Sequence, residues 1–387
     1  MDMIAQMWEL TGFYFLNWQQ VLMIGIGMVL VWLAVAKGFE PLLLVPIGFG
    51  VIVGNMPFDP TDAISVYATG SEGHPEGTFA LIYFLVSHEV LPPLIFMGIG
   101  VLTDFSYMIS NPRLILLGAA AQLGVFVTFL GAVLIGDKIE GIYITEAAAA
   151  AIGIIGGADG PTSIYIANRM APGWLGAIAI AAYSYMSLVP VIQPPVMRLL
   201  TTRKERMIRM KPPREVSKQL RVMFPVIGFL ITCLFIPSAM VLLGMLFLGN
   251  LIRESGVTDR LARTIGGPFI DSVTVLLGFS VGLATTWEKF LNTEVLVIFA
   301  LGAFAFTIAT AGGILFAKLM NKFSKDPINP LVGSAGVSAV PMAARVSQQV
   351  AFKDDPNNYI LMHAMAPNVA GVIGTAVAAG VFIAMLS

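Results

Sequence analysis

The sequence predicts an all-α polytopic membrane protein, and its composition and its hydrophobic runs lead to this fold class. Of the 387 residues, 57% are hydrophobic and only 12% are charged, whereas a soluble domain carries about 25% charged residues. The mean hydropathy is +0.84. The apolar residues gather in long runs, and about 20 consecutive apolar residues suffice for one helix to cross a bilayer. The chain is therefore expected to cross a membrane many times.

The N-terminus is expected to lie at the membrane surface and to lead into a series of spans. Residues 1–20 contain aromatic side chains but no lysine or arginine, so they lack the basic region of a cleavable signal and are interpreted as an interfacial segment. Apolar spans follow near 21–36, 41–57, 78–101, 113–136, 143–168 and 174–200. They recur near 222–236, 237–251, 267–286, 294–320, 328–350 and 358–386.

A basic linker at 201–221 separates two halves, 21–200 and 222–387, that repeat short motifs in the same order. The repeated pairs are Gly100–Phe105 with Gly282–Trp287, Gly54-Asn55 with Gly249-Asn250, and Ala158–Pro161 with Ser338–Pro341. A repeat that keeps its order across two halves indicates an internal duplication, which is common in membrane transport proteins.

The distribution of basic residues predicts that the two repeats are inverted. If the fifth segment of each half is a re-entrant hairpin, each half crosses five times and the halves run antiparallel. The positive-inside rule places the linker in the cytoplasm, and only Lys138, Arg169 and Lys289 then fall outside. The acidic loop Asp59–Glu76 also falls outside. The prediction is about ten transmembrane helices, two opposed hairpins and both termini outside.

The first hairpin, with its tip near 153–163, carries the most informative residue, Asp159. A carboxylate at membrane depth costs about 2.5–3.5 kcal/mol on insertion scales. Several glycines and Pro161 surround it, and Thr162 and Ser163 follow it. Helix breakers leave backbone carbonyls unpaired, which is tolerated only inside protein or along a watery cavity. An acid among free oxygens suits Na⁺ or a transferred proton.

The second hairpin, 328–350, has similar chemistry, with small residues, two prolines and the polar Asn329, Ser334 and Ser338. A glycine-packed helix crossing is the alternative interpretation, and for Ser334 the two are equally favoured. Arg345 is the only basic residue within either hairpin. A guanidinium there needs an anion, either a bound carboxylate or Asp159, unless it extends to the membrane surface.

Two further polar residues lie within predicted spans. Asn368 follows Pro367 in the last span, where a broken helix would offer an amide oxygen to a cation. Tyr185 is a candidate proton donor, although a tyrosine at a packed interface is the more common case. The single cysteine, Cys233, excludes an internal disulfide, and the sequence has no phosphate-binding loop for ATP.

Several long motifs resemble the β subunit of the sodium-pumping, biotin-dependent decarboxylases that act on oxaloacetate, methylmalonyl-CoA and glutaconyl-CoA. The similarity runs from about residue 20 to the end of the chain. The motifs that carry it are Gly156–Thr162, Ala181–Met186, Val191–Pro195, Asn329–Val346 and Pro367–Gly374. One departure is Ala366, where glycine is expected before Pro-Asn.

The resemblance implies a membrane subunit that decarboxylates carboxybiotin, consumes a proton from outside and exports Na⁺ across the bacterial inner membrane. It implies three partners, namely a soluble carboxyltransferase α subunit, a biotin carrier domain and a small membrane γ or δ subunit. No cofactor would be attached covalently to this chain. The alternative function is a Na⁺-coupled symporter for a carboxylate, which shares inverted hairpins and an intramembrane arginine.

The resemblance also assigns roles to individual residues. It implies that Asp159 binds Na⁺ and the coupling proton in turn and that Tyr185 handles protons. The remaining Na⁺-site residues that it implies are Asn329, Gly333, Ser338 and Asn368. Arg345 is expected to bind carboxybiotin, with Asn329 close by. A core that bears the hairpins is expected to slide against a scaffold, as in elevator-type transporters.

Overall fold

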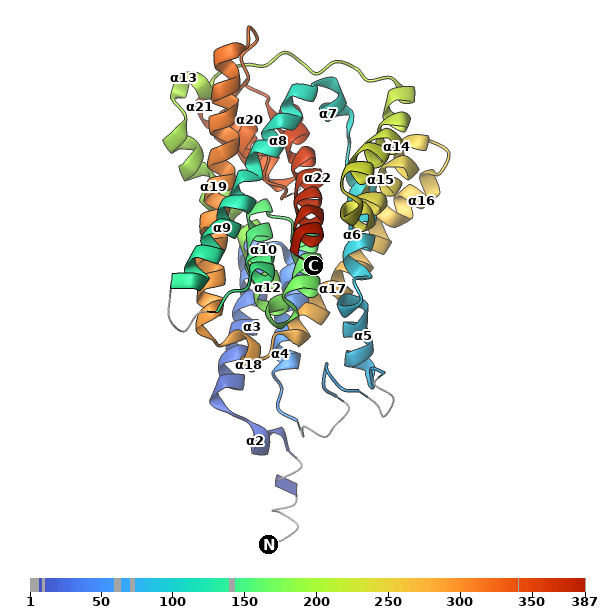
Figure 1. Ribbon diagram of the computed structural model, residues 1–387, viewed down its shortest axis with the longest axis vertical. Helices are drawn as coiled ribbons and strands as arrows, with labels where there is room; N and C mark the ends of the chain where they lie inside the picture. Colours follow the sequence, from blue (N-terminus) through green and yellow to red (C-terminus); the bar gives the residue numbers. More distant parts are fainter. Residues whose placement is uncertain are drawn as a thin grey trace.

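The computed structural model describes residues 7–8, 11–58, 64–69, 74–138, 143–339 and 341–386. Parts of the predicted interfacial segment (1–6 and 9–10), parts of the acidic loop (59–63 and 70–73), the Lys138 side chain and position 340 of the second hairpin lie outside the described residues. Among the described residues every regular element is a helix (Figure 1), which confirms the all-α prediction.

The first half contains eleven of these helices before the linker. They are α2 (Gly12–Phe15), α3 (Trp18–Lys37), α4 (Pro41–Gly54), α5 (Thr78–Ser87), α6 (Leu91–Leu102), α7 (Ser106–Ser110), α8 (Ile115–Ala121), α9 (Leu123–Lys138), α10 (Glu146–Ile154), α11 (Gly160–Met170) and α12 (Leu175–Leu200). The sequence fixes several ends locally. Helix α3, for example, begins at a capping box between Asn17 and Gln20 and ends at Gly38, whose φ is +67°.

The linker and the second half contain the remaining helices. They are α13 (Arg203–Arg206), α14 (Lys218–Phe235), α15 (Met240–Ser255), α16 (Asp259–Thr264), α17 (Ile270–Ala284), α18 (Trp287–Phe290), α19 (Thr293–Phe323), α20 (Leu331–Ser334), α21 (Met342–Asp354) and α22 (Leu361–Leu386). A π-type turn, η5 (Ile265–Phe269), joins α16 to α17 around Pro268.

Eight helices in the described part of the chain are long and apolar enough to span a membrane. A ninth span results if α5 and α6, which meet at 64°, are counted together. Helix α4 is apolar but shorter, so the predicted number of about ten depends on counting it as a span.

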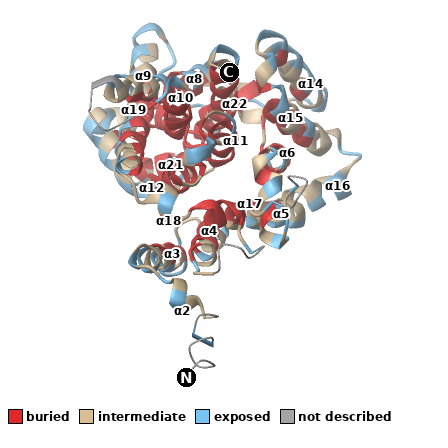
Figure 2. Ribbon diagram, turned by 60° about the horizontal axis from the view of Figure 1, so that its bottom comes forward, coloured by how far each residue is buried: buried red, intermediate tan, exposed pale blue. Residues whose placement is uncertain are grey.

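The helices pack as two groups. Helices α8–α12 and α19–α22 contact mainly one another and contain both predicted hairpins, and we call them the hairpin group. Helices α3–α6 and α14–α17 form the second set, called here the frame group. Figure 2 shows that the most deeply buried helices, including α10, α11 and α22, belong to the hairpin group.

Two helix pairs hold the frame group together, and both contain glycine contacts. In the α4–α17 pair, a Cβ added to Gly50 would lie 2.4 Å from Phe279 O. In the α6–α15 pair, a Cβ added to Gly100 would lie only 2.0 Å from Leu246 O. Real Cβ atoms do not approach so closely, so both crossings depend on glycine.

The motifs that repeat in the sequence make matching contacts in these two pairs. Asn55 Nδ2 donates to Thr285 O at 2.9 Å, and Asn250 Nδ2 donates to Thr103 O at the same distance. Each asparagine thus holds the end of a helix from the other half of the chain. The Gly-Asn motif of each half therefore contacts the threonine-containing motif of the other half.

The basic linker is attached to the base of the second hairpin. The Asn329 amide donates to Arg206 O at 2.8 Å and to Ile208 O at 3.0 Å, and Asn358 donates to the same two carbonyls. Ion pairs join Arg206 to Asp354 and Arg209 to Asp355. We call this arrangement the linker clamp.

Candidate functional site

Asp159 lies at a break between two helices of the first hairpin. Helix α10 ends in the 3₁₀ turn η2 (Ile155–Gly157), and Ala158 then adopts a left-handed conformation with a φ of +52°. Asp159 caps α11, since its Oδ1 accepts a hydrogen bond from Thr162 N at 3.3 Å. Its Oδ2 is buried without a partner among the described residues, and the residue is 4% exposed.

The second hairpin breaks at the same place in space. Helix α20 ends at Ser334 and α21 begins at Met342, and Ser338 lies in the break. Ser338 N donates to Gly157 O at 2.9 Å, so the tips of the two hairpins are in direct contact. The Ser338 hydroxyl is buried and lacks a described partner.

Helix α22 passes beside the second break and adds an amide oxygen. Asn368 Nδ2 donates to Ala335 O at 3.0 Å and to Val337 O at 2.9 Å. These bonds use both amide hydrogens, while Asn368 Oδ1 is buried without a described partner. The expectation of a broken helix at Pro367 is wrong, because α22 continues without interruption from Leu361 to Leu386.

The two tips and α22 thus bring several unsatisfied oxygens into one region. Most buried polar atoms in folded proteins have a partner, so a cluster of unsatisfied ones calls for a ligand. Carboxylate, hydroxyl and amide oxygens are the donors that a hard cation prefers. The members that lack a described partner are Asp159 Oδ2, Thr162 Oγ1, Ser338 Oγ and Asn368 Oδ1. We call these four atoms the oxygen cluster.

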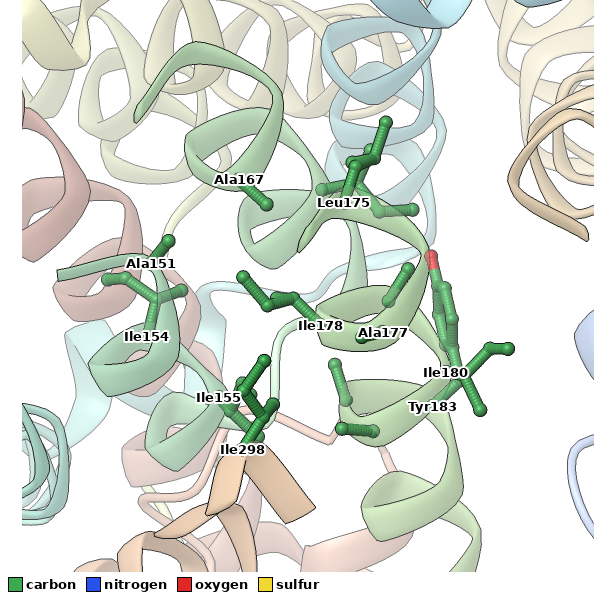
Figure 3. Packing of buried hydrophobic residues seen from close by; sticks show 14 of the residues in the cluster. Ala151, Ile154, Ile155, Ala167, Leu175, Ala177, Ile178, Ile180, Tyr183 and Ile298 are labelled. Carbon is green, nitrogen blue, oxygen red and sulfur yellow. The ribbon is translucent and has the colours of Figure 1, made fainter. Parts of the chain in front are cut away.

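A tyrosine that sequence reasoning missed, Tyr183, packs against Gly160, the residue that follows Asp159, and lines the same cavity as Asp159. A Cβ added to Gly160 would be 2.1 Å from the Tyr183 ring, so only glycine fits beside it. The Tyr183 hydroxyl is buried and unpartnered within the described chain. Figure 3 shows Tyr183 on α12 at one edge of a cluster of buried apolar side chains, next to Ile180 in this view and apart from Ile155 and Ile298.

Tyr185, the predicted proton donor, faces a different neighbour. Residues two apart on a helix point about 200° apart, so Tyr183 and Tyr185 cannot both face Asp159. The Tyr185 hydroxyl donates to the Phe299 carbonyl, and its ring packs beside Gly302 of α19. The sequence offered two tyrosines on α12, and only the helical phase relative to Asp159 could have distinguished them.

We expect Tyr183→Phe to raise the Na⁺ concentration that half-saturates activity by about tenfold. The expectation rests on the Tyr183 hydroxyl, which has no described partner in this structure, donating to Asp159 when Na⁺ is bound. A hydrogen bond to a charged group is worth about 1.5–3 kcal/mol, and 1.4 kcal/mol corresponds to a factor of ten. The assay is Na⁺-dependent turnover of the intact complex. Tyr185→Phe, the same chemical change on the other side of α12, is the control. An equal shift in both variants would contradict a specific role for Tyr183.

Three other predicted site residues lie away from the oxygen cluster. Asn329 is fully engaged in the linker clamp, and its Oδ1 also accepts from Leu331 N at 3.1 Å. Gly333 forms a close backbone crossing, since an added Cβ would lie 2.1 Å from Gly313 O. Arg345 lies on the exposed side of α21 and has no ion-pair partner among the described residues. The structure therefore brings together Asp159, Ser338 and Asn368 only.

A cavity of about 480 Å³ adjoins the oxygen cluster. From the hairpin group, Asp159, Tyr183 and Ser338 contribute to its wall. The opposite wall belongs to α4, α6 and the η5–α17 segment of the frame group. The site therefore lies where the two groups of helices meet, and a small ion or molecule can reach Asp159 through this space.

A membrane protein in which two broken segments meet around buried oxygens belongs to the class of ion-translocating membrane proteins. Residues 19–386 match the model of a protein family described as the Na⁺-transporting oxaloacetate decarboxylase beta subunit. A family with this description falls within the class of ion-translocating membrane proteins. The chain belongs to this family of β subunits of Na⁺-transporting decarboxylases.

Individual relatives are similar over nearly their whole length. The methylmalonyl-CoA decarboxylase subunit beta of Veillonella parvula is 54% identical over 377 residues, which cover 97% of this chain and 96% of that protein. The glutaconyl-CoA decarboxylase subunit beta of Acidaminococcus fermentans is 53% identical, with the same coverage. The oxaloacetate decarboxylase beta chain of Klebsiella pneumoniae is 48% identical, and 96% of each chain is covered.

Proposed function

We propose that this chain decarboxylates carboxybiotin presented by the carrier domain of a partner and uses the reaction to export Na⁺. The reaction cleaves the bond between the ureido nitrogen and the carboxylate, releases CO₂ and leaves a biotin anion that takes up one proton. The single observation that carries the proposal is the buried carboxylate of Asp159 near the contact of the two hairpin tips, whose Oδ2 has no hydrogen-bond partner among the described residues.

The oxygen cluster supports Na⁺ binding by Asp159, Ser338 and Asn368, with Thr162 as a further ligand. A carboxylate in this position can hold Na⁺ or a proton, but charge repulsion disfavours both at once. Exchange of one for the other would couple Na⁺ movement to proton uptake from outside. The Tyr183 hydroxyl has no partner among the described residues, and Tyr183 lines the same cavity as Asp159, so we propose that it can donate to this carboxylate during turnover.

The roles of the remaining predicted residues are indirect in this geometry. Gly333 permits the α19–α20 crossing that positions the second hairpin, and Asn329 anchors its base to the linker. Tyr185 would handle protons only through a neighbouring group, because its hydroxyl already donates to Phe299 O. Gly333 and Asn329 would thus position the second hairpin without contributing a side-chain ligand to the oxygen cluster.

Arg345, which has no ion-pair partner in the described part of the chain, is proposed to bind the carboxylate of carboxybiotin. Arginine can bind a carboxylate with two parallel hydrogen bonds, which lysine cannot do. We expect Arg345→Lys to raise the apparent KM for carboxybiotin about tenfold or more, since each charged hydrogen bond is worth about 1.5–3 kcal/mol. Decarboxylation of free carboxybiotin by the purified complex measures this value. An unchanged KM would assign Arg345 to a structural role.

The two helix groups support a mechanism in which the site faces each side of the membrane in turn. The reciprocal packing of the repeated motifs is the contact pattern expected of inverted repeats. We propose that the hairpin group moves against the frame group, with the linker and the carrier domain on the cytoplasmic side and both termini outside. Asn168 Nδ2 donates to Ser87 O at 2.9 Å across this boundary. A disulfide between Ser87→Cys and Asn168→Cys should therefore block turnover, and full activity would contradict the movement.

The function is tested with the assembled complex, including its carboxyltransferase, carrier and small membrane subunits, in proteoliposomes. The expected result is CO₂ release that requires Na⁺, together with ²²Na⁺ movement away from the side of the carrier domain. Uptake of a carboxylate without release of CO₂ would favour the symporter and contradict the proposal.

A further inference from the structure

The wall of the cavity opposite Asp159 carries two carboxylates that the proposed mechanism has not used. Glu40 lies at the start of α4, and Asp271 lies in the first turn of α17. Thr103 and Thr274 lie in the same wall. Among the described residues that line the cavity, none is lysine, arginine or histidine.

The packing of α4 against α17 places these two carboxylates at the same end of the frame group. A Cβ on Gly278 would lie 3.3 Å from Leu43 O, and one on Gly282 would lie 2.2 Å from Ile47 O. Gly278 therefore meets Leu43, and Gly282, four residues later, meets Ile47, four residues later on α4. Because the contacts advance in the same direction along both chains, the two helices are parallel. Their N-terminal ends, with Glu40 and Asp271, therefore lie together.

Both carboxylates are available to a cation. Neither Glu40 nor Asp271 forms an ion pair within the described part of the chain, and Asp271 is exposed. An unpaired negative wall facing a low-dielectric cavity raises the local concentration of cations and lowers that of anions. The cavity is therefore unfavourable for the anionic carboxybiotin and favourable for Na⁺.

We propose that Glu40 and Asp271 form a cation vestibule through which Na⁺ reaches Asp159, an inference that rests on the proposed function. The independent observation is that Asp159 and Ser338 line the same cavity and are each only 4% exposed, and that Asp159 Oδ2 and Ser338 Oγ have no hydrogen-bond partner among the described residues. The cation would thus meet the exposed Asp271 and the half-buried Glu40 first and a buried ligand set afterwards.

The charge pattern of the sequence agrees with loading from the cytoplasm. Lys37 precedes Glu40 by three residues, and Arg260 and Arg263 precede Asp271 within α16. All three basic residues belong to the side that the positive-inside rule assigns to the cytoplasm. The vestibule would therefore open toward the side from which Na⁺ is exported.

The test compares Glu40→Gln, Asp271→Asn and the double variant in the assembled complex. These substitutions keep side-chain shape and remove the charge. We expect the half-saturating Na⁺ concentration to rise about threefold to fivefold in each single variant and further in the double variant. The rate at saturating Na⁺ should change by less than about twofold, and added choline chloride should reduce the difference from wild type by screening.

Glu215→Gln is the matched control, because Glu215 is an exposed linker carboxylate outside the cavity. An unchanged half-saturating concentration in the double variant would overturn the vestibule. A fall in maximal rate without a change in half-saturation would overturn it as well. Asp159→Asn in the same assay separates the two proposals, since full activity of that variant would contradict the proposed function itself.

Discussion

Asp159→Asn is expected to abolish Na⁺-dependent decarboxylation. A unit charge about 4 Å from Na⁺ contributes about 4 kcal/mol at an effective dielectric constant of about 20. The asparagine amide keeps the size of the side chain but not this attraction, and it cannot alternate between Na⁺ and a proton. At subsaturating Na⁺, turnover should fall about a hundredfold or more. The measurement is CO₂ release and ²²Na⁺ transport by reconstituted complex at several Na⁺ concentrations.

The control for this variant removes a carboxylate elsewhere. Asp326 lies at the surface, where it pairs with Lys211 at 2.9 Å, and exposed ion pairs contribute at most about 1 kcal/mol. Asp326→Asn should therefore leave Na⁺-dependent turnover close to wild type. If Asp159→Asn also retained full Na⁺ dependence, the oxygen cluster would not be the transport site.

Gly333→Ala is expected to have the second large effect, through packing. The new methyl carbon would lie 2.1 Å from Gly313 O and 2.5 Å from Gly313 C, and a backbone cannot yield as a flexible side chain can. Overpacking of this kind costs about 1–3 kcal/mol. Helices α19 and α20 must separate, and the second hairpin should lose its alignment with Asp159. Lower thermal stability in detergent and weaker Na⁺ activation should appear together.

Gly25→Ala provides a direct comparison within a helix of the frame group. An added Cβ at Gly25 would meet no atom within 4 Å, and alanine has the higher helix propensity. This variant should be neutral or slightly more stable. Equal behaviour of the two alanine variants would show that the α19–α20 crossing does not constrain the site.

Hydropathy and helix breakers predicted much of the fold because they act locally. Long apolar runs gave the helices, and the glycines and Pro161 near Asp159 gave the break that separates α10 from α11. Local rules failed at Pro367, which α22 accommodates without a break. Proline is tolerated in a membrane helix when neighbouring groups satisfy the freed carbonyl, and that depends on tertiary packing.

The site was only partly predictable for the same reason. Asp159, Ser338 and Asn368 stood out as polar residues in apolar segments, and they lie together. The choice between Tyr183 and Tyr185 required the rotation of α12 relative to the hairpin. Asn329 resembled an ion ligand in sequence, but its amide is satisfied by the linker, a contact across 121 and 123 residues that no local pattern reveals.

In the proposed orientation, the linker clamp connects a segment at the cytoplasmic surface to the hairpin that carries part of the proposed ion site. Because Asn329 and Asn358 hold the backbone at Arg206 and Ile208, any displacement of the second hairpin must pull this segment with it. The strain would then fall on the extended chain between Ile208 and α14, which belongs to the frame group. A soluble partner that binds this linker segment would respond to the position of the second hairpin, and so to the side of the membrane that the proposed ion site faces, without contacting the membrane interior.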